Sequence, residues 1–500
     1  MFQKNLTVVF KYANIAMFTA VFLSFVLLRL INLGYSEYIP DETTVMTPVK
    51  NSEINTWFLL AQRKGPVQFL VARVVNIFNI SVFDEFSYRF PFFLASVFGL
   101  FFFYKFAKNM EGQFVAVVAT LFLGLNGMLI AFGRVVQYQS LNLLFSSAGL
   151  YFLSLLKDEE HRIRNSILGS LCLTLSIMSH WDMVFVLPPA LFLIFKYVLF
   201  SPSIRGRQKR SIIGALSLPV LVLFMPFFIN YSGVALSDAA NIGYFKTRIG
   251  QAEVSPENIM RNLKEYVTKV ELYNPFVYLY ALGALAFAGL IGSKRAYSYF
   301  YWFLLSLSAF IFFVIKPGTH VYNLFYPAVI LAALGAQYFY QLFKGLLSKA
   351  VVVALVALFS FFAYQGYLLF AEPAVDYPWS QEVILGHKTR PYSQQSLPNN
   401  IIGFPIYRGW KEAAEFLVGE NARNGSDLPY VTNEESSIGG FYLPLRYGKE
   451  GEYYAIGVKR PLSFVNDYTF PSIKNKKTVK RIEVYGENTM RIYKASVNEQ

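Results

Sequence analysis

An adjacent acidic pair, Asp41 and Glu42, follows the first strongly apolar segment of this 500-residue chain. The same stretch, residues 35–91, contains a basic turn with Lys64 and closes on Arg89, where the next apolar segment begins. Ionisable side chains at a membrane face are costly and usually serve a function. A carboxylate can take the proton of an attacking hydroxyl, and cations can bind a phosphate leaving group. We therefore predict that this stretch forms the active site of a membrane-embedded enzyme.

The composition places these residues in an integral membrane protein. Of the chain, 55% is hydrophobic and only 15% charged, with a mean hydropathy of +0.39. A soluble domain cannot bury that much apolar surface. The single cysteine, Cys172, excludes an intrachain disulfide. The formal charge of +14 comes largely from cations beside apolar runs, which fits membrane topology rather than nucleic-acid binding.

Apolar runs predict about eleven membrane-spanning helices. The first, near 14–33, is interpreted as a retained anchor rather than a signal peptide, because its apolar core is long and no cleavage site follows. The others, each judged long enough to cross about 30 Å of hydrocarbon, lie near 88–107, 113–132, 140–156, 165–179, 184–200, 212–231, 275–292, 297–315, 322–341 and 350–371. Alternation from a cytoplasmic N-terminus places every short basic loop inside, as the positive-inside rule expects.

This topology leaves two long outer loops, 35–87 and 232–274. Within the first loop, residues 67–80 are too few and too polar to span, which is typical of an interfacial helix. We expect an all-α polytopic membrane domain at 1–371, followed by a small extracytoplasmic α/β domain at 372–500.

Sequence patterns in the tail support a folded domain. A helix is predicted from about Ile406, where Trp410 and Leu417 recur at helical spacing, and a strand near Pro429. An alternating hairpin is predicted around Gly486.

The outer turns carry more polar and ionisable side chains than topology requires, and an alternating bundle brings them to one face. The candidates for donor-phosphate binding are Lys64, Arg89, Arg134 and Arg248. The candidates for substrate binding are Tyr138, His180, Asp182, Tyr244, Lys316 and His320. Together with a carboxylate, these groups are what a lipid-linked phosphate donor would need.

Asp41 is the predicted general base. Adjacent Asp and Glu side chains diverge, so they do not both flank one reacting bond as glycosidase carboxylates do. Glu42 is expected to orient a ligand or bind a metal. The nearby pair Asp84 and Glu85 is typical of an ordinary helix cap.

The evidence for a metal site is slight. His180 with Asp182 could be interpreted as ligands, but two scattered histidines without a thiolate cluster are a poor metal signal. No metal site is therefore predicted, and a divalent-metal cofactor stays open.

Several short motifs, each found once, follow one another along about residues 1–370. They are Asp41-Glu42 after the first span, Lys64-Gly65-Pro66 before a juxtamembrane helix, Tyr88-Arg89-Phe90-Pro91 opening span two, Gly133-Arg134 before span four, Ser179-His180-Trp181-Asp182 between spans five and six, and Lys316-Pro-Gly-Thr-His320. In this the chain resembles the GT-C membrane glycosyltransferases of the protein O-mannosyltransferase and aminoarabinose-transferase kind, family 39.

The resemblance implies an inverting transfer of a sugar from a polyprenyl-phosphate donor on the outer face of the plasma membrane. It implies that Asp41, with Glu42, is catalytic and that Lys64 contacts the donor phosphate. The acceptor can be a protein, a lipid or a glycan. Many relatives carry an aspartate after Gly-Arg where this chain has Gln137-Tyr138-Gln139. A second acidic contact is therefore missing or supplied elsewhere.

The main alternative is a multi-pass transporter or flippase of lipid-linked or small polar substrates. The sequence does not favour it, because the unusual charges lie at the outer ends of spans and not in paired broken helices at mid-membrane. A third interpretation, an anchor for the outer domain, leaves eleven spans and the outward charges unexplained.

Overall fold

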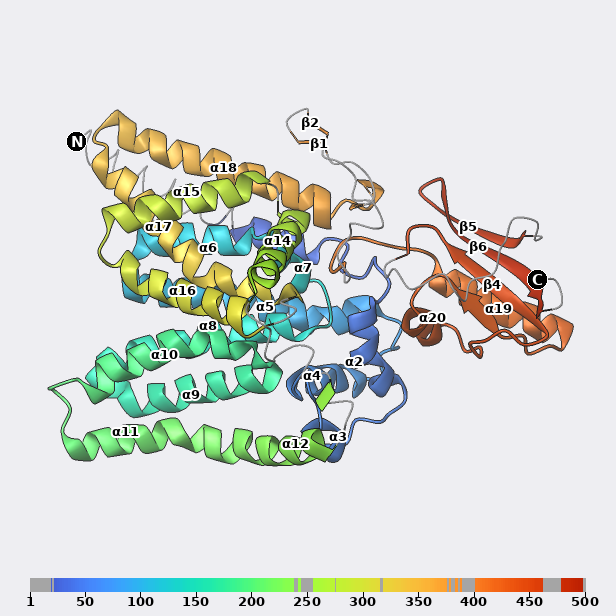
Figure 1. Ribbon diagram of the computed structural model, residues 1–500, viewed down its shortest axis with the longest axis horizontal. Helices are drawn as coiled ribbons and strands as arrows, with labels where there is room; N and C mark the ends of the chain where they lie inside the picture. The colour runs from blue at the N-terminus through green and yellow to red at the C-terminus, as the bar shows by residue number, and fades with distance from the viewer. Residues whose placement is uncertain are drawn as a thin grey trace.

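The computed structural model describes residues 19, 22–237, 242–243, 255–274, 276–314, 318–375, 377–378, 383–384, 387–388, 401–461 and 478–497. Long, roughly aligned helices form a bundle, and a smaller part with a β-sheet lies beyond one end of it (Figure 1). This arrangement confirms the predicted class, an all-α polytopic membrane domain with a small C-terminal α/β domain.

The bundle is built from apolar helices. Their bounds are α5 (Glu85–Glu111), α6 (Gln113–Gly124), α7 (Gly127–Phe132), α8 (Tyr138–Ser154), α9 (Arg162–Ser179), α10 (Leu187–Ile194), α11 (Gly206–Pro219), α12 (Met225–Ser237), α15 (Phe276–Gly292), α16 (Ala296–Phe312), α17 (Phe325–Leu342) and α18 (Leu346–Phe370). The short helices η3 (Trp181–Val186), η4 (Phe195–Leu199), η5 (Val220–Phe224) and η6 (Gly318–Leu324) extend some of them, and α14 (Pro256–Tyr273) precedes α15.

Within the described residues, 6 helical stretches are long and apolar enough to cross a membrane. Several of the other predicted spans appear as shorter apolar helices, among them α6, α15 and α16. Of the first predicted span, residues 22–30 form a helix. The chain is a multi-pass membrane protein, and the number eleven stays a prediction.

The predicted span at 113–132 consists of two helices. α6 ends at Gly124, and α7 restarts where the side chain of Asn126 accepts the N–H of Leu129 at 3.2 Å. The Asn274 side chain accepts the Gly127 N–H at 2.7 Å. Because these buried amides satisfy backbone groups at the break, the interruption is stable inside the bundle.

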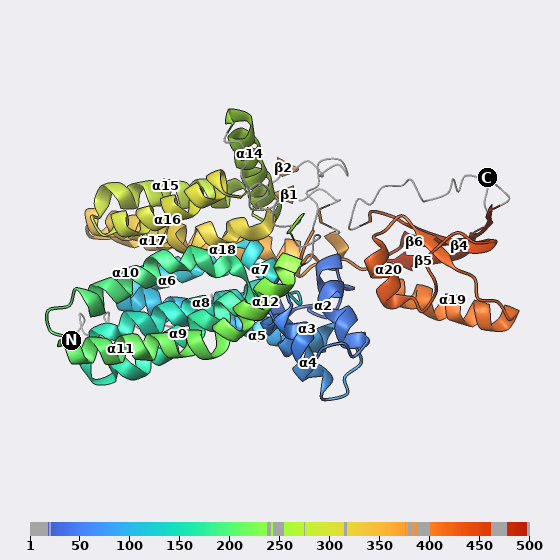
Figure 2. The same ribbon diagram turned by 60° about the horizontal axis from the view of Figure 1, so that its bottom comes forward.

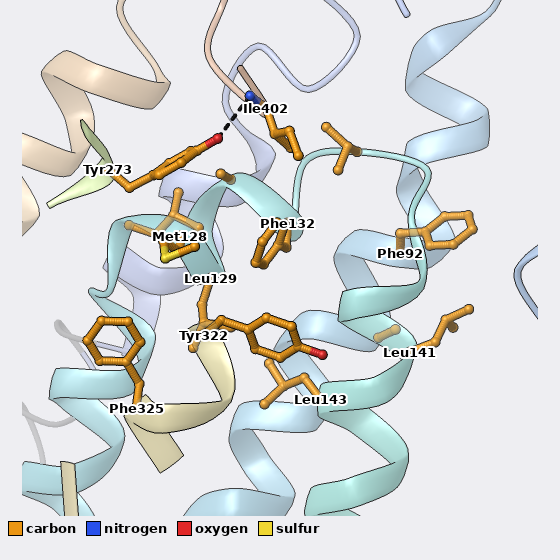
Figure 3. Packing of buried hydrophobic residues seen from close by; sticks show 14 of the residues in the cluster. Phe92, Met128, Leu129, Phe132, Leu141, Leu143, Tyr273, Tyr322, Phe325 and Ile402 are labelled. Carbon is orange, nitrogen blue, oxygen red and sulfur yellow. Dashed lines mark hydrogen bonds between the residues drawn. The ribbon is translucent and has the colours of Figure 1, made fainter. Parts of the chain in front are cut away.

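The core continues to the end of the bundle from which the C-terminal part begins. Phe132 and Tyr322 pack edge to face, with 5.3 Å between ring centroids, and the Ile402 N–H donates to the Tyr273 hydroxyl at 3.1 Å (Figure 3). Gly403 has a φ of +75°, and a Cβ there would lie 2.5 Å from the Cα of Ala131. Glycine thus lets residues 401–404 pack directly against α7.

The first loop folds into short helices. α2 (Pro40–Lys50), α3 (Thr56–Leu60) and α4 (Val67–Asn76) lie at the end of the bundle nearest the C-terminal domain (Figure 2). The helix expected at 67–80 is therefore present as α4. The predicted cap is also confirmed, because the Asp84 side chain accepts the Ser87 N–H at 3.2 Å and begins α5.

The C-terminal domain contains α19 (Trp410–Asn424), α20 (Ser436–Tyr442) and a four-stranded sheet in the order β3-β4-β6-β5. The strands are β3 (Tyr430–Thr432), β4 (Glu452–Val458), β5 (Thr478–Val484) and β6 (Glu487–Ser496); β3 is parallel to β4 and the other pairs are antiparallel. Two residue pairs, β1 (Val383–Ile384) and β2 (His387–Lys388), form a separate ribbon. The helix, strand and hairpin predicted in this tail are confirmed.

Buried polar contacts fix this domain to the first loop. The Glu37 carboxylate accepts backbone N–H groups of Arg408 at 2.9 Å, of Gly409 at 3.0 Å and of Trp410, at the start of α19. A carboxylate suits this position because a helix N-terminus presents unpaired N–H groups and a positive dipole end. Glu85 adds contacts to Lys411 and to the Tyr442 hydroxyl, at 2.5 and 2.8 Å.

Candidate active site

The structure brings Asp41 and Lys64 together. Asp41 lies in the first turn of α2, and its Oδ1 is 2.9 Å from the Lys64 Nζ, 23 residues later in the chain. The two side chains are 29% and 25% exposed, so a substrate can reach both. A carboxylate and an ammonium in contact at an accessible position can handle a proton and a phosphate respectively.

A glycine holds the turn that carries Lys64. Gly65 has a φ of +85°, and a Cβ there would lie 2.1 Å from the Met178 carbonyl oxygen in the last turn of α9. The Trp181 indole N–H donates to the Arg63 carbonyl at 2.9 Å. These contacts clamp the Lys64 turn against the junction of α9 and η3, so the lysine is positioned by backbone packing.

We expect Gly65→Ala to lower both stability and turnover. A left-handed backbone conformation costs alanine about 1–2 kcal/mol, and the clash with Met178 adds to it and displaces Lys64. Gly425→Ala is the matched control, since Gly425 lies in the left-handed region, with a φ of +56°, and has nothing within 4 Å of its Cβ position. Thermal unfolding and turnover of both variants measure the difference, and equal losses in the two would contradict the packing role of Gly65.

Glu42, predicted to act beside Asp41, is fully buried and occupied by the protein itself. Its Oε1 accepts Arg89 Nε and the Val136 N–H, both at 2.8 Å. Its Oε2 accepts Arg89 Nη2 at 2.7 Å and the Ile39 N–H at 3.1 Å. Glu42 thus joins the start of α2, the start of α5 and the turn before α8. This arrangement indicates that Glu42 positions Asp41 and does not meet the substrate.

The donor-phosphate role predicted for Arg89 and Arg134 does not fit their surroundings. Arg89 is 2% exposed, and besides Glu42 it donates to the carbonyls of Leu33, Ser36 and Glu37. Arg134 is 3% exposed. Its guanidinium donates to four carbonyls, those of Leu28, Ile31, Asn32 and Gly403. Both guanidinium groups donate hydrogen bonds to backbone carbonyls near the end of the first helix. Buried carbonyls without hydrogen-bond partners would be costly.

A second polar cluster, which we call the His-Asp-His cluster, consists of His180, Asp182 and His320. Asp182 Oδ1 lies 3.0 Å from His180 Nδ1 and 2.9 Å from His320 Nδ1. Tyr138 stacks on His180 with 3.8 Å between ring centroids, and its hydroxyl is 3.5 Å from His320 Nδ1. Four of the six predicted substrate-binding residues therefore meet at one place. The other two, Tyr244 and Lys316, and the predicted phosphate ligand Arg248 lie outside the described residues.

The charges of Lys64 and of His320 in the His-Asp-His cluster affect the pKa of Asp41. Burial raises the pKa of the Asp41 carboxyl, but the charge and hydrogen bond of Lys64, the nearby amide of Gln137 and the charge of His320 outweigh it and bring the pKa below its usual value. Asp41 is therefore a carboxylate at neutral pH. Gln137 was not predicted as a site residue; it helps lower the pKa of Asp41, and its neutral amide adds none of the repulsion that a second carboxylate would.

Comparisons with known proteins agree with this architecture. Residues 63–229 match the family model of dolichyl-phosphate-mannose-protein mannosyltransferases. The fold matches ArnT from Cupriavidus metallidurans bound to undecaprenyl phosphate, with a TM-score of 0.55 and 12% identity, over 96% of this chain and 98% of that one. Apo ArnT from the same organism matches with a TM-score of 0.51 and 12% identity, over 99% and 98% of the two chains.

A more distant match supports the same fold. The Archaeoglobus fulgidus oligosaccharyltransferase in complex with Zn and sulfate has a TM-score of 0.50 and 11% identity, over 88% of this chain and 68% of that one. No curated protein matches the chain. The predicted resemblance is confirmed at the level of architecture: this chain has the GT-C fold of membrane glycosyltransferases.

Proposed function

We propose that the protein is a glycosyltransferase that moves a sugar from a polyprenyl-phosphate donor to an acceptor hydroxyl. The observation that carries the proposal is the Asp41–Lys64 contact at 2.9 Å, accessible at one end of a GT-C bundle. The match of residues 63–229, which include Lys64, to a family of lipid-phosphate-dependent mannosyltransferases supports it. So does the solved complex of a structural neighbour with undecaprenyl phosphate.

In the proposed reaction, Asp41 takes the proton of the acceptor hydroxyl while the hydroxyl oxygen attacks the anomeric carbon of the sugar. The bond from that carbon to the phosphate oxygen breaks on the opposite face, which inverts the configuration. The electron pair leaves with the polyprenyl phosphate. A lysine ammonium has three N–H donors, and one of them is used for Asp41. The others are available to the phosphate as its charge develops.

We place this reaction on the outer face of the plasma membrane, with the N-terminus cytoplasmic. The positive-inside pattern of the short loops supports this orientation. We assign the membrane domain to residues 1–371 and the extracytoplasmic domain to 372–500, consistent with the end of α18 at Phe370. The acceptor is a protein, lipid or glycan hydroxyl presented beneath or beside the outer domain.

The direct test is turnover by the purified protein in nanodiscs with a panel of polyprenyl-phosphate sugars and simple acceptors. Release of polyprenyl phosphate that depends on acceptor and protein is the expected result. Movement of the intact donor between leaflets of proteoliposomes, with no release, would contradict the enzyme and favour a flippase.

Lys64→Gln is expected to move the acid limb of the turnover profile to higher pH. Burial raises the pKa of Asp41 and the Lys64 charge lowers it, so removing that charge raises the pKa. A base acts only when deprotonated, and turnover of the variant should therefore begin to fall at a higher pH than in wild type. Lys64→Arg, which keeps the charge, is the control. An unshifted acid limb in Lys64→Gln would contradict the proposed coupling.

A further inference from the structure

We propose that the His-Asp-His cluster binds a divalent transition-metal ion that helps hold the donor phosphate. The cluster was expected to bind substrate directly, with no metal. The inference about the phosphate rests on the proposed function, whereas the inference about the metal rests on the geometry of His180, Asp182 and His320 alone.

The spacing of the ligand atoms fits coordination to one ion. One oxygen or nitrogen of each residue lies within 4.8 Å of the others. The Asp182 oxygen is 3.0 and 2.9 Å from the two imidazole nitrogens. Ligand atoms with bonds of about 2.0–2.2 Å to one ion lie about 3–3.5 Å apart, depending on the coordination geometry, which is close to these separations. Two imidazoles and one carboxylate are a ligand set that suits zinc or iron and leaves coordination positions open.

The imidazole of His180 faces Asp182 closely. Its Nδ1 lies 3.0 Å from Asp182 Oδ1 and 3.2 Å from the backbone nitrogen of Asp182. The Nδ1 of His320 faces the same carboxylate oxygen at 2.9 Å. Three ligand atoms of the kinds that bind zinc or iron therefore converge on one point.

The cluster is rigidly supported yet accessible. His180 is the C-terminal cap of α9, Asp182 lies in η3 and His320 lies in η6. The stacked Tyr138 ring fixes the plane of the His180 imidazole, 9° from its own. The side chains of His180, Asp182 and His320 are 13%, 6% and 23% exposed. An ion held by them therefore keeps open positions for a ligand.

The position of the cluster explains what the ion would do. The cluster adjoins the turn that carries Lys64, because a Cβ at Gly65 would lie 2.9 Å from the carbonyl oxygen of Ser179, the residue before His180. Arg89 and Arg134 are buried and occupied by carbonyls or by Glu42. Besides Lys64, a dication in the cluster would supply positive charge toward the phosphate of a bound donor.

The test is metal binding measured without any reference to turnover. The protein is purified without a polyhistidine tag, stripped with a chelator and titrated with Co²⁺ and Zn²⁺. Visible absorption and bound-metal analysis are the readouts, with one ion per chain expected. Asp182→Asn and His320→Gln should each weaken binding at least tenfold. His161→Gln is the matched control, since His161 is exposed and caps the end of α9 opposite to His180.

The results for metal binding test the metal site independently of whether the protein turns over a donor. One ion per chain that is lost in either cluster variant and kept in His161→Gln supports the metal site, even if no donor turns over. Absence of binding to folded wild type at tens of micromolar metal overturns the metal site, even if the chelated protein releases polyprenyl phosphate. Binding that survives in both cluster variants also overturns it, because the ion then lies elsewhere.

Discussion

Replacing Asp41 with asparagine should lower turnover by a hundredfold or more while leaving the protein folded. Loss of a general base typically costs about 10² to 10⁴ in rate. Asparagine keeps the size of the side chain and can still accept a hydrogen bond from Lys64, whose Nζ lies 2.9 Å from the Asp41 carboxylate in wild type. It cannot take the proton of the acceptor hydroxyl. The measurement is polyprenyl-phosphate release in nanodiscs, with kcat and KM determined separately.

The expected loss is in kcat, because Asp41 acts on the proton that moves in the transition state and not on the donor in its ground state. Glu53→Gln is the matched control: it makes the same chemical change at an exposed position of the same loop. Full activity in Asp41→Asn would place the base elsewhere. A rise in KM with unchanged kcat would make Asp41 a binding residue instead.

The sequence located Asp41 and Lys64 because both interrupt an apolar context. An acid directly after a span, and a Lys-Gly-Pro turn before a short amphipathic helix, are local features that can be recognised from a short segment of the sequence. The same reasoning could not tell whether Arg89 or Arg134 faces a substrate or the protein. That depends on which carbonyls converge on them, and those of Leu28, Ser36 and Gly403 come from three separate segments.

Features that depend on contacts between residues far apart in the chain also could not be predicted from the sequence. Hydropathy joined α6 and α7 into one span because a single polar residue, Asn126, marks the break, and the second amide at the break, that of Asn274, comes from the residue after α14. The His-Asp-His cluster brings together residues separated by 138 positions. Each histidine was predicted to lie in an outer turn, but no periodicity predicts that two such turns direct their imidazoles at one carboxylate.

Glu42→Gln is expected to be the most destabilising conservative change in the first loop. Breaking one partner of a buried ion pair typically costs about 3–5 kcal/mol, because the remaining charge is left without compensation in a low dielectric. Glu42 is fully buried, and Arg89 would keep only neutral carbonyls and an amide around its guanidinium. Thermal unfolding in detergent, followed by tryptophan fluorescence, measures the loss. Glu487→Gln, in an exposed pair with Lys459 at 2.9 Å, should have little effect.

Glu42→Gln also decides between two roles for the second acid of the pair. If Glu42 positions Asp41, the variant unfolds at lower temperature, and the molecules that remain folded keep the KM of wild type for the donor. If Glu42 takes part in the chemistry, as its position next to Asp41 first indicated, the variant keeps its unfolding temperature and loses turnover. The four hydrogen bonds that saturate both of its oxygens favour the first result. A carboxylate whose lone pairs are all directed at Arg89 and backbone N–H groups has no free acceptor for a substrate proton.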